Sequence, residues 1–452
     1  MAVIELGFVG SGGDELPDPP SRSSPWRRRQ VRRVAAAVLA ALCLASVTAS
    51  DHAPAPRGLR TLWDAAFGTG DTFAAAGDTV VVLNDDATAQ RLTGYRRGDG
   101  VVRWSRTLDY RAAYVFTAAD PGVVLLPAGE RTAPSTTDPT ATEDYFTQAV
   151  AVDATTGAEL WRVPGDLTAA GFDARFMGGG VLLVDHHAAS ADAAQVRLVG
   201  LRDGRTLWSR ATPGVQWVAP GPDPRRPDRI ATVDRSGRVR VLRMSDGAPI
   251  GGGTVEWQRS TATDHGYPVL EWHGTQVYVL RMSDTRVTTT AYGGQPLRRL
   301  WRVDDPTADA GYGCGPVWCL SSGTMLAGRD WDTGAERWRA PYGDFTRSIG
   351  DTMLAIHGGP GSRYRIVDAA TGRTVAALGG EPLSDDFGTV VLTLTPTIRP
   401  LGLTAVGRVD LRTGESFLLG AIDGATSYGC TIEQRLLFCP SIHRRLTVTA
   451  IG

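Results

Sequence analysis

Short runs in which apolar and polar residues alternate recur along most of the chain. Representative runs are 78–84 (DTVVVLN), 181–187 (VLLVDHH), 237–244 (GRVRVLRM), 276–282 (QVYVLRM) and 389–395 (TVVLTLT). They are rich in β-branched residues and are bounded by Gly, Asp and Ser, which is typical of short strands. The 3.6-residue stripes of packed helices are missing from these units. The pattern therefore predicts an all-β chain.

A turn motif separates these strands and recurs at intervals of roughly 40 residues. It reads Asp-x-x-Thr-Gly-x-x-x-Trp at 153–161 and again at 330–338, whereas three copies shorten the turn to Asp-Gly and 291–301 holds a degenerate copy. A period of this length indicates a propeller or a helical array, and the strand pattern favours the propeller. The repeat residues are Asp99, Gly100, Trp104, Asp153, Gly157, Trp161, Asp203, Gly204, Trp208, Asp246, Gly247, Trp301, Asp330, Gly334, Trp338, Asp368, Gly372, Asp410 and Gly414.

Each residue type in the motif has a structural task. Glycine supplies the positive φ that closes a hairpin between the third and fourth strands of a unit, and Asp or Thr bonds to the turn amides. The tryptophan falls on the outer strand, where its ring can wedge between sheets while its N–H reaches a carbonyl of the next sheet. The repeat residues are therefore predicted to shape turns and dock blades, not to react.

This repeat resembles that of the pyrroloquinoline-quinone-like β-propellers. The resemblance extends over residues 58–452. That superfamily includes quinoprotein alcohol dehydrogenases and also non-catalytic scaffolds, such as the outer-membrane assembly lipoprotein of Gram-negative bacteria. The resemblance implies the fold and leaves the function open.

Closure of the ring is predicted from the two ends of the propeller sequence. The segment 435–451 offers strands without a following outer strand, and 59–67 offers an outer strand with Trp63 and no partners of its own. Joining them completes a blade. We expect about eight four-stranded blades, with seven possible, and suspect that the unit near 247 or the one near 294 is not a separate unit.

The first 57 residues have a different composition. Residues 1–26 are predicted to be a disordered tail, 27–49 a signal anchor or a signal peptide, and 50–57 a linker. An arginine cluster precedes the apolar run 34–49, which orients the N-terminus toward the cytoplasm. We expect this run to form one apolar helix in the membrane, with the propeller outside the cell. Cleavage of the segment would instead give a secreted protein.

Four of the five cysteines lie in two similar segments, 312–319 (YGCGPVWC) and 428–439 (YGCTIEQRLLFC), and Cys43 lies in the apolar run. Cysteines on adjacent strands of one blade come within disulfide range, which predicts Cys314–Cys319 and Cys430–Cys439. A Cys314–Cys430 link stays open as an alternative. Zinc binding by these cysteines is a further alternative, but no histidine pair accompanies them. The even count is typical of an oxidising compartment.

Composition removes several classes of function. The net charge is -1, which argues against a nucleic-acid partner. Every one of the 47 basic residues is arginine, so lysine-dependent phosphate loops and Schiff bases are excluded. The adjacent histidines at 186 and 187 are expected to be surface loop residues. The polar insert 128–146 is interpreted as a surface excursion or a loop that contacts a partner.

The resemblance also implies what a quinoprotein dehydrogenase would need. In that family the quinone stacks between a tryptophan and a disulfide of adjacent cysteines, over a calcium ion held by Glu, Asn and Asp. This sequence has no Cys-Cys pair, so we predict no catalytic, cofactor-binding or metal-binding residue.

The leading hypothesis is a membrane-tethered, non-catalytic propeller that binds a protein or a small ligand at one face. The alternatives are a quinone-dependent oxidoreductase using pyrroloquinoline quinone with calcium, or a fixed structural subunit of an envelope complex.

Overall fold

The structure, a computed structural model, describes residues 58–452 apart from 87–88, 119–121, 135–141, 168–178, 188–191, 222–226, 258–266, 284–285, 344–345, 359–362, 386 and 426–428. The tail, the apolar helix and the linker expected within 1–57 lie outside the described residues, as does Cys43. In the described part of the chain, no helix is long and apolar enough to cross a membrane.

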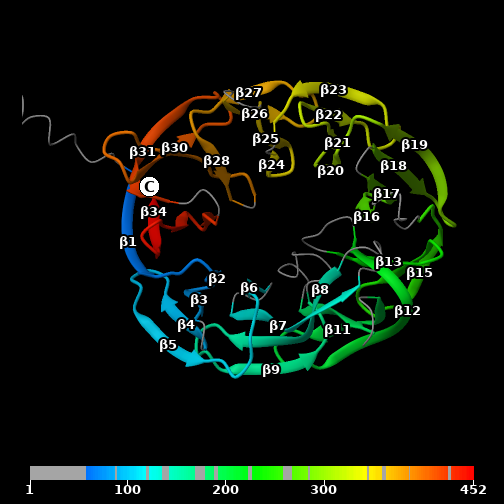
Figure 1. Ribbon diagram of the computed structural model, residues 1–452, viewed down its shortest axis with the longest axis horizontal. Coiled ribbons are helices and arrows are strands. Elements are labelled where there is room, and N and C mark those ends of the chain that lie inside the picture. The colour runs from blue at the N-terminus through cyan, green and yellow to red at the C-terminus, as the bar shows by residue number, and fades with distance from the viewer. Residues whose placement is uncertain are drawn as a thin grey trace, which may run out of the picture. The chain divides into compact units, whose positions relative to one another are not determined.

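The strands form eight antiparallel sheets that are arranged as the blades of a ring (Figure 1), so the prediction of an all-β, eight-bladed propeller is confirmed. Seven blades have four strands each. The first two are β2 (Thr72–Ala76), β3 (Thr79–Asp85), β4 (Gln90–Arg96) and β5 (Val102–Thr107), and then β6 (Phe116–Thr117), β7 (Val123–Pro134), β8 (Thr142–Asp153) and β9 (Glu159–Pro164). Four further blades are β16 (Tyr267–His273), β17 (Gln276–Ser283), β18 (Arg286–Gly293) and β19 (Arg298–Asp305); β20 (Ala310–Cys314), β21 (Val317–Ser321), β22 (Met325–Arg329) and β23 (Glu336–Pro341); β24 (Thr346–Ile349), β25 (Met353–His357), β26 (Tyr364–Asp368) and β27 (Thr374–Ala377); and β28 (Glu381–Ser384), β29 (Val391–Pro396), β30 (Leu403–Val409) and β31 (Ser416–Asp423). The last of the seven joins β32 (Thr431–Glu433), β33 (Leu436–Pro440) and β34 (Arg445–Ile451) to β1 (Leu59–Ala66). The eighth has six: β10 (Gly180–His186), β11 (Ala193–Gly200), β12 (Thr206–Pro220), β13 (Arg229–Asp234), β14 (Arg238–Arg243) and β15 (Pro249–Thr254).

The six-stranded blade explains the count of blades. It contains two repeat units, because β12 pairs with β11 through its first part and with β13 through its second. Of the two units suspected from the sequence, the one near 247 is not a separate blade, whereas the one near 294 forms a blade of its own, β16 to β19. Gly247 donates its N–H to the carbonyl of Arg243 at 2.8 Å, and Gly294 turns between β18 and β19 with a φ of 81°. The eight turn-bearing units and the composite blade form eight sheets, because two of the turn-bearing units share a sheet.

The ring closes through the composite blade expected from the sequence. Strand β1 pairs antiparallel with β34, from Leu59 opposite Ile451 to Ala66 opposite Arg445. The neighbouring blade is fastened by Arg97, which is 6% exposed and donates from Nη1 to Gln434 Oε1 at 2.9 Å. The first and last strands of the described chain thus belong to one sheet.

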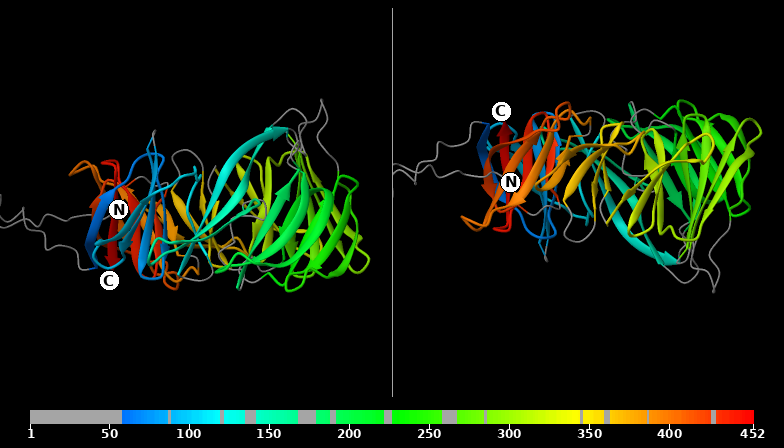
Figure 2. Two further views of the ribbon diagram at one scale, coloured as in Figure 1. Left: turned by 90° about the horizontal axis from the view of Figure 1, so that it is seen from below. Right: turned by 90° about the horizontal axis from the view of Figure 1, so that it is seen from above.

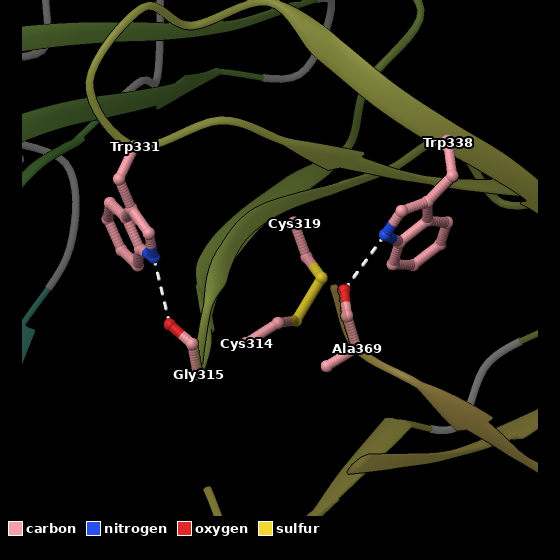
Figure 3. Close-up of a disulfide and its surroundings, with 6 residues drawn as sticks. All are labelled: Cys314, Gly315, Cys319, Trp331, Trp338 and Ala369. Carbon is pink, nitrogen blue, oxygen red and sulfur yellow. Dashed lines mark hydrogen bonds between the residues drawn. A yellow bond between two sulfur atoms is a disulfide. The ribbon is translucent and has the colours of Figure 1, made fainter. Parts of the chain in front are cut away.

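An indole group joins most blades to the next repeat unit. Each ring packs on the turn glycine of the following unit, and its Nε1–H donates to a nearby carbonyl. The donors and acceptors are Trp63 to Arg97 (2.7 Å), Trp104 to Ala154 (3.0 Å), Trp161 to Leu201 (2.8 Å), Trp208 to Met244 (2.6 Å), Trp301 to Trp331 (3.0 Å) and Trp338 to Ala369 (2.8 Å). Figure 3 shows the last of these contacts.

The acids of the repeat serve their own turns. Asp153 Oδ1 accepts the N–H groups of Thr155 and Thr156 at 3.0 and 2.8 Å. The same kind of contact is made by Asp330, Asp368 and Asp410, and the Asp-Gly turns use Asp99, Asp203 and Asp246 for one amide each. These carboxylates are already occupied by backbone donors.

Both predicted disulfides are present, and a Cys314–Cys430 link is therefore ruled out. Cys314–Cys319 joins β20 to β21 with a Cα–Cα distance of 5.8 Å (Figure 3). Cys430–Cys439 joins the start of β32 to β33 with a Cα–Cα distance of 4.3 Å. Bonding to each other leaves none of these four thiols for zinc.

Because successive strands are antiparallel, the connections alternate between two faces of the ring. The turn face carries the Thr-Gly and Asp-Gly turns. The link face carries the connections from blade to blade and the loops between the second and third strands of each blade, such as 397–402 and 441–444.

We expect Trp338→Ala to lower the free energy of unfolding by about 3–5 kcal/mol, because a buried ring and its contact with the next blade are both lost. Urea unfolding of the full chain, followed by circular dichroism, measures the change. Phe417→Ala is the control, since Phe417 also lies on an outer strand but is 50% exposed. An equal loss of unfolding free energy in the two variants would contradict the role of Trp338 in joining the blades.

Candidate functional site

A cavity of about 830 Å³ opens on the link face, on the inner side of the ring. The start of β2 and the link before it contribute Phe67 to Ala74, β6 contributes Phe116 and Thr117, and the segments around the Cys430–Cys439 disulfide contribute the opposite wall. Arg347 reaches the cavity from β24. Four blades therefore build one hollow, which we call the link-face cavity.

The acids of the link-face cavity hold parts of the fold in place. Asp71 accepts the N–H of Gly68 at 2.6 Å, the amide of Asn84 at 2.6 Å and the N–H of Asp85 at 2.8 Å. The carboxylate of Glu433 lies 3.8 Å from the guanidinium of Arg97. These contacts fix the rim of the cavity, and Arg97 compensates the charge of Glu433, so both acids have structural roles.

The polar insert found in the sequence continues a hairpin on the link face. Strands β7 and β8 stay paired as far as Pro134 opposite Thr142, and Figure 2 shows this long hairpin in cyan. Tyr145 and Phe146 within it are 6% and 7% exposed. The described part of the insert is therefore an ordered two-stranded ribbon with a buried side, and the segment 135–141 lies outside the described residues.

A buried Asp–His pair supports the base of this hairpin. Asp166 is 1% exposed, and its Oδ2 accepts the N–H of Phe146 at 3.1 Å and lies 3.3 Å from Nε2 of His186. The ring of Tyr145 lies 4.8 Å from that of His186. The prediction that both histidines are surface residues is wrong for His186, because the hairpin and Asp166 cover it. His187 is exposed.

A second polar group is partly buried near the turn face. Glu271 on β16 accepts a hydrogen bond from the N–H of Gly313, but its burial raises its pKa to about 7. His273, two residues along the same strand, stacks on Trp331 with ring centroids 4.1 Å apart. Burial lowers the pKa of His273. Trp331 itself donates to the carbonyl of Gly315 at 2.9 Å (Figure 3).

The structure separates the repeat residues from the link-face cavity. The turns and indoles lie toward the turn face or between blades, and of the residues singled out in the sequence only Cys430 lines the cavity. Phe73, Phe116 and Arg347 were not singled out, because no local motif connects residues that come from different blades. Among the described residues, no group of three or more His, Cys, Asp or Glu side chains is placed to hold a metal ion.

Eight blades, repeated glycine turns and docked indoles define a β-propeller of repeated units. Residues 128–314 match the family model described as outer membrane protein assembly factor BamB. This match and the propeller fold support a PQQ-like β-propeller repeat protein. No curated protein matches the sequence.

Several solved structures are similar at low sequence identity. BamB from Moraxella catarrhalis has 14% identity and a TM-score of 0.42, with 87% of this chain and 97% of that chain covered. The computationally designed Ika8 protein has 14% identity and a TM-score of 0.43, with 86% and 98% covered. The quinohemoprotein alcohol dehydrogenase ADHIIG from Pseudomonas putida HK5 has 12% identity and a TM-score of 0.36, with 68% and 72% covered.

The raised pKa of Glu271 predicts a pH-dependent stability. A carboxyl whose pKa is higher in the folded state stabilises that state at low pH, so its contribution is complete below about pH 4.5 and is lost as the pH rises through about 7. The loss is up to about 3 kcal/mol. We expect Glu271→Gln to remove this part of the pH dependence in urea unfolding between pH 5 and pH 8.

The matched control is Glu415→Gln, because Glu415 is exposed. It should keep the pH dependence of the unchanged protein. A Glu271→Gln variant with that same dependence would contradict the burial of an unfavourable charge. Because His273 is present in every variant, its own titration cancels in the comparison.

Proposed function

We propose that this chain is a non-catalytic β-propeller, tethered to the cell membrane through residues 34–49, that binds a protein or a small ligand outside the cytoplasm. The observation that carries the proposal is the division between the two faces. The repeat acids are engaged in their own turns, whereas the link-face cavity and the long β7–β8 hairpin lie on the link face. Loops held at one end of a rigid scaffold are common sites of recognition.

Two features of the sequence and the structure support a location of the propeller outside the cytoplasm. The apolar run 34–49 follows an arginine cluster, which favours an N-terminus in the cytoplasm. The pairs Cys314–Cys319 and Cys430–Cys439 are typical of an oxidising compartment. Both features agree with a propeller on the outer side of the membrane.

The tether is tested with an epitope tag at the N-terminus. Protease added to intact cells should degrade the propeller and spare the tag, and the mature protein should keep the tag. A mature protein without the tag would show cleavage and replace the anchor with a secreted form. A tag added after Gly452 serves as the control, since it should be digested.

The binding role is tested by cross-linking in intact cells, followed by identification of the captured proteins. We expect one reproducible partner that depends on the propeller. The competing enzymatic role is tested by adding pyrroloquinoline quinone and calcium to the purified full chain and assaying dye reduction with alcohols and sugars. Turnover in that assay would overturn the non-catalytic proposal.

A further inference from the structure

The link-face cavity continues into an exposed apolar surface. Ile442 lines the cavity and is 58% exposed. In the neighbouring loop, 397–402, Ile398 and Leu401 are 84% and 83% exposed, which are unusual values for large apolar side chains. The two loops meet at Gly424, where a Cβ would lie 2.8 Å from the carbonyl of Gly402 and 3.0 Å from Ile442.

These exposed side chains stand on ordered loops. The N–H of Ile442 donates to the carbonyl of Gly424 at 2.8 Å, and Thr397 closes its loop with an N–H contact to the carbonyl of Leu403 at 2.9 Å. The loops therefore present Ile398, Leu401 and Ile442 in fixed positions. A surface of this kind is typical of a contact site for another molecule.

The charge around this surface is positive. Arg399 and Arg444 are exposed, and among the described residues neither has a carboxylate within ion-pair distance. The cavity acids Asp71 and Glu433 are engaged with the protein's own donors. Nε2 of His443 lies 4.0 Å from Oδ1 of Asp423. A complementary ligand carries carboxylates.

The cavity wall is aromatic. The rings of Phe67 and Phe73 lie 5.9 Å apart at an angle of 73°, and Phe116 lines the same space from β6. Aromatic rings pack well in such edge-to-face arrangements. A volume of about 830 Å³ holds a large aromatic side chain together with its flanking backbone.

We propose that the link-face cavity and the loops 397–402 and 441–444 bind an extended polypeptide segment of a partner protein, in which an aromatic side chain is flanked by carboxylates. The aromatic group enters the cavity beside Phe67 and Phe73. The carboxylates meet Arg444 and Arg399, and further apolar side chains of the segment cover Ile398 and Leu401. The apolar surface outside the cavity is what favours a polypeptide over a small acid. This inference rests on the proposed binding function, and it adds where on the propeller the partner binds and which chemical groups of the partner are recognised.

Fluorescence anisotropy with the full chain in detergent tests the chemistry. The probes are fluorescein-labelled pentapeptides with a central Phe or Trp between Asp or Glu residues, compared with peptides in which the aromatic residue is Ser or the acids are Lys. We expect only the acidic aromatic peptides to bind. Arg444→Glu and Arg399→Glu should each weaken binding by roughly tenfold. Arg412→Glu, an exposed arginine on the turn face, should leave it unchanged.

Three results would overturn the inference. One is the absence of binding by every acidic aromatic peptide at about 1 mM, which is the weakest useful affinity. Another is that the lysine peptides bind as tightly as the acidic aromatic peptides, or that both arginine variants bind the acidic aromatic peptides as tightly as the unchanged protein does. The third is binding of free 3-phenylpropionate as tightly as the peptides, since that result assigns the cavity to a small acid.

Photo-cross-linking in intact cells separates this inference from the proposed function. A benzoylphenylalanine is placed at Ile398 or Leu401 on the link face and, as the control, at the exposed Arg373 on the turn face. A partner captured from the link-face positions, and reduced by Arg444→Glu, supports the inference. A partner captured only from position 373 overturns the inference and leaves the binding function standing. Capture from none of the three positions counts against both.

Discussion

One contact, an indole ring laid on the glycine of the next turn, determines how the blades of this protein meet. The ring of Trp104 leaves so little room that a Cβ on Gly157 would lie 2.4 Å from it, and a Cβ on Gly94 of its own sheet would lie 2.3 Å away. The glycine at 157 also needs its φ of 72°. The turn, the ring and the hydrogen bond to the carbonyl of Ala154 therefore depend on one another. This dependence explains why the residues recur as a unit.

Where the tryptophan is missing, the backbone takes over the contact. The unit that ends with β15 meets the following one through a parallel bridge between Gly253 and Leu297, with the N–H of Leu297 donating to the carbonyl of Gly252 at 3.1 Å. At another junction, a Cβ on Gly414 would lie 2.5 Å from the carbonyl of Val375. Close approach of the turn to the neighbouring outer strand is thus the common requirement, and the indole is one way to satisfy it.

The predictable part of the structure is the part that rests on local spacing. The turns, the strands, both disulfides and the pairing of 59–66 with the C-terminal strands follow from patterns within or between repeats. The merging of two units into one sheet was not evident from the sequence, because Pro213 and Gly214 inside β12 are typical of a turn, whereas the strand continues through them from one unit to the next. The burial of His186 was missed for a similar reason, since Asp166 and Tyr145 reach it from other strands.

The link-face cavity lies beyond such reasoning because residues from four blades converge on it, each in a different local context. The same fact separates architecture from recognition. Docking constrains the turn face at nearly every unit, so a change there disturbs the junction between blades. The loops of the link face take no part in the indole contacts, and among the described residues they hold the most exposed large apolar side chains, Ile398 and Leu401, and the long hairpin of β7 and β8. Residues that docking leaves unconstrained can vary without cost to the ring, and recognition is therefore best sought on the link face.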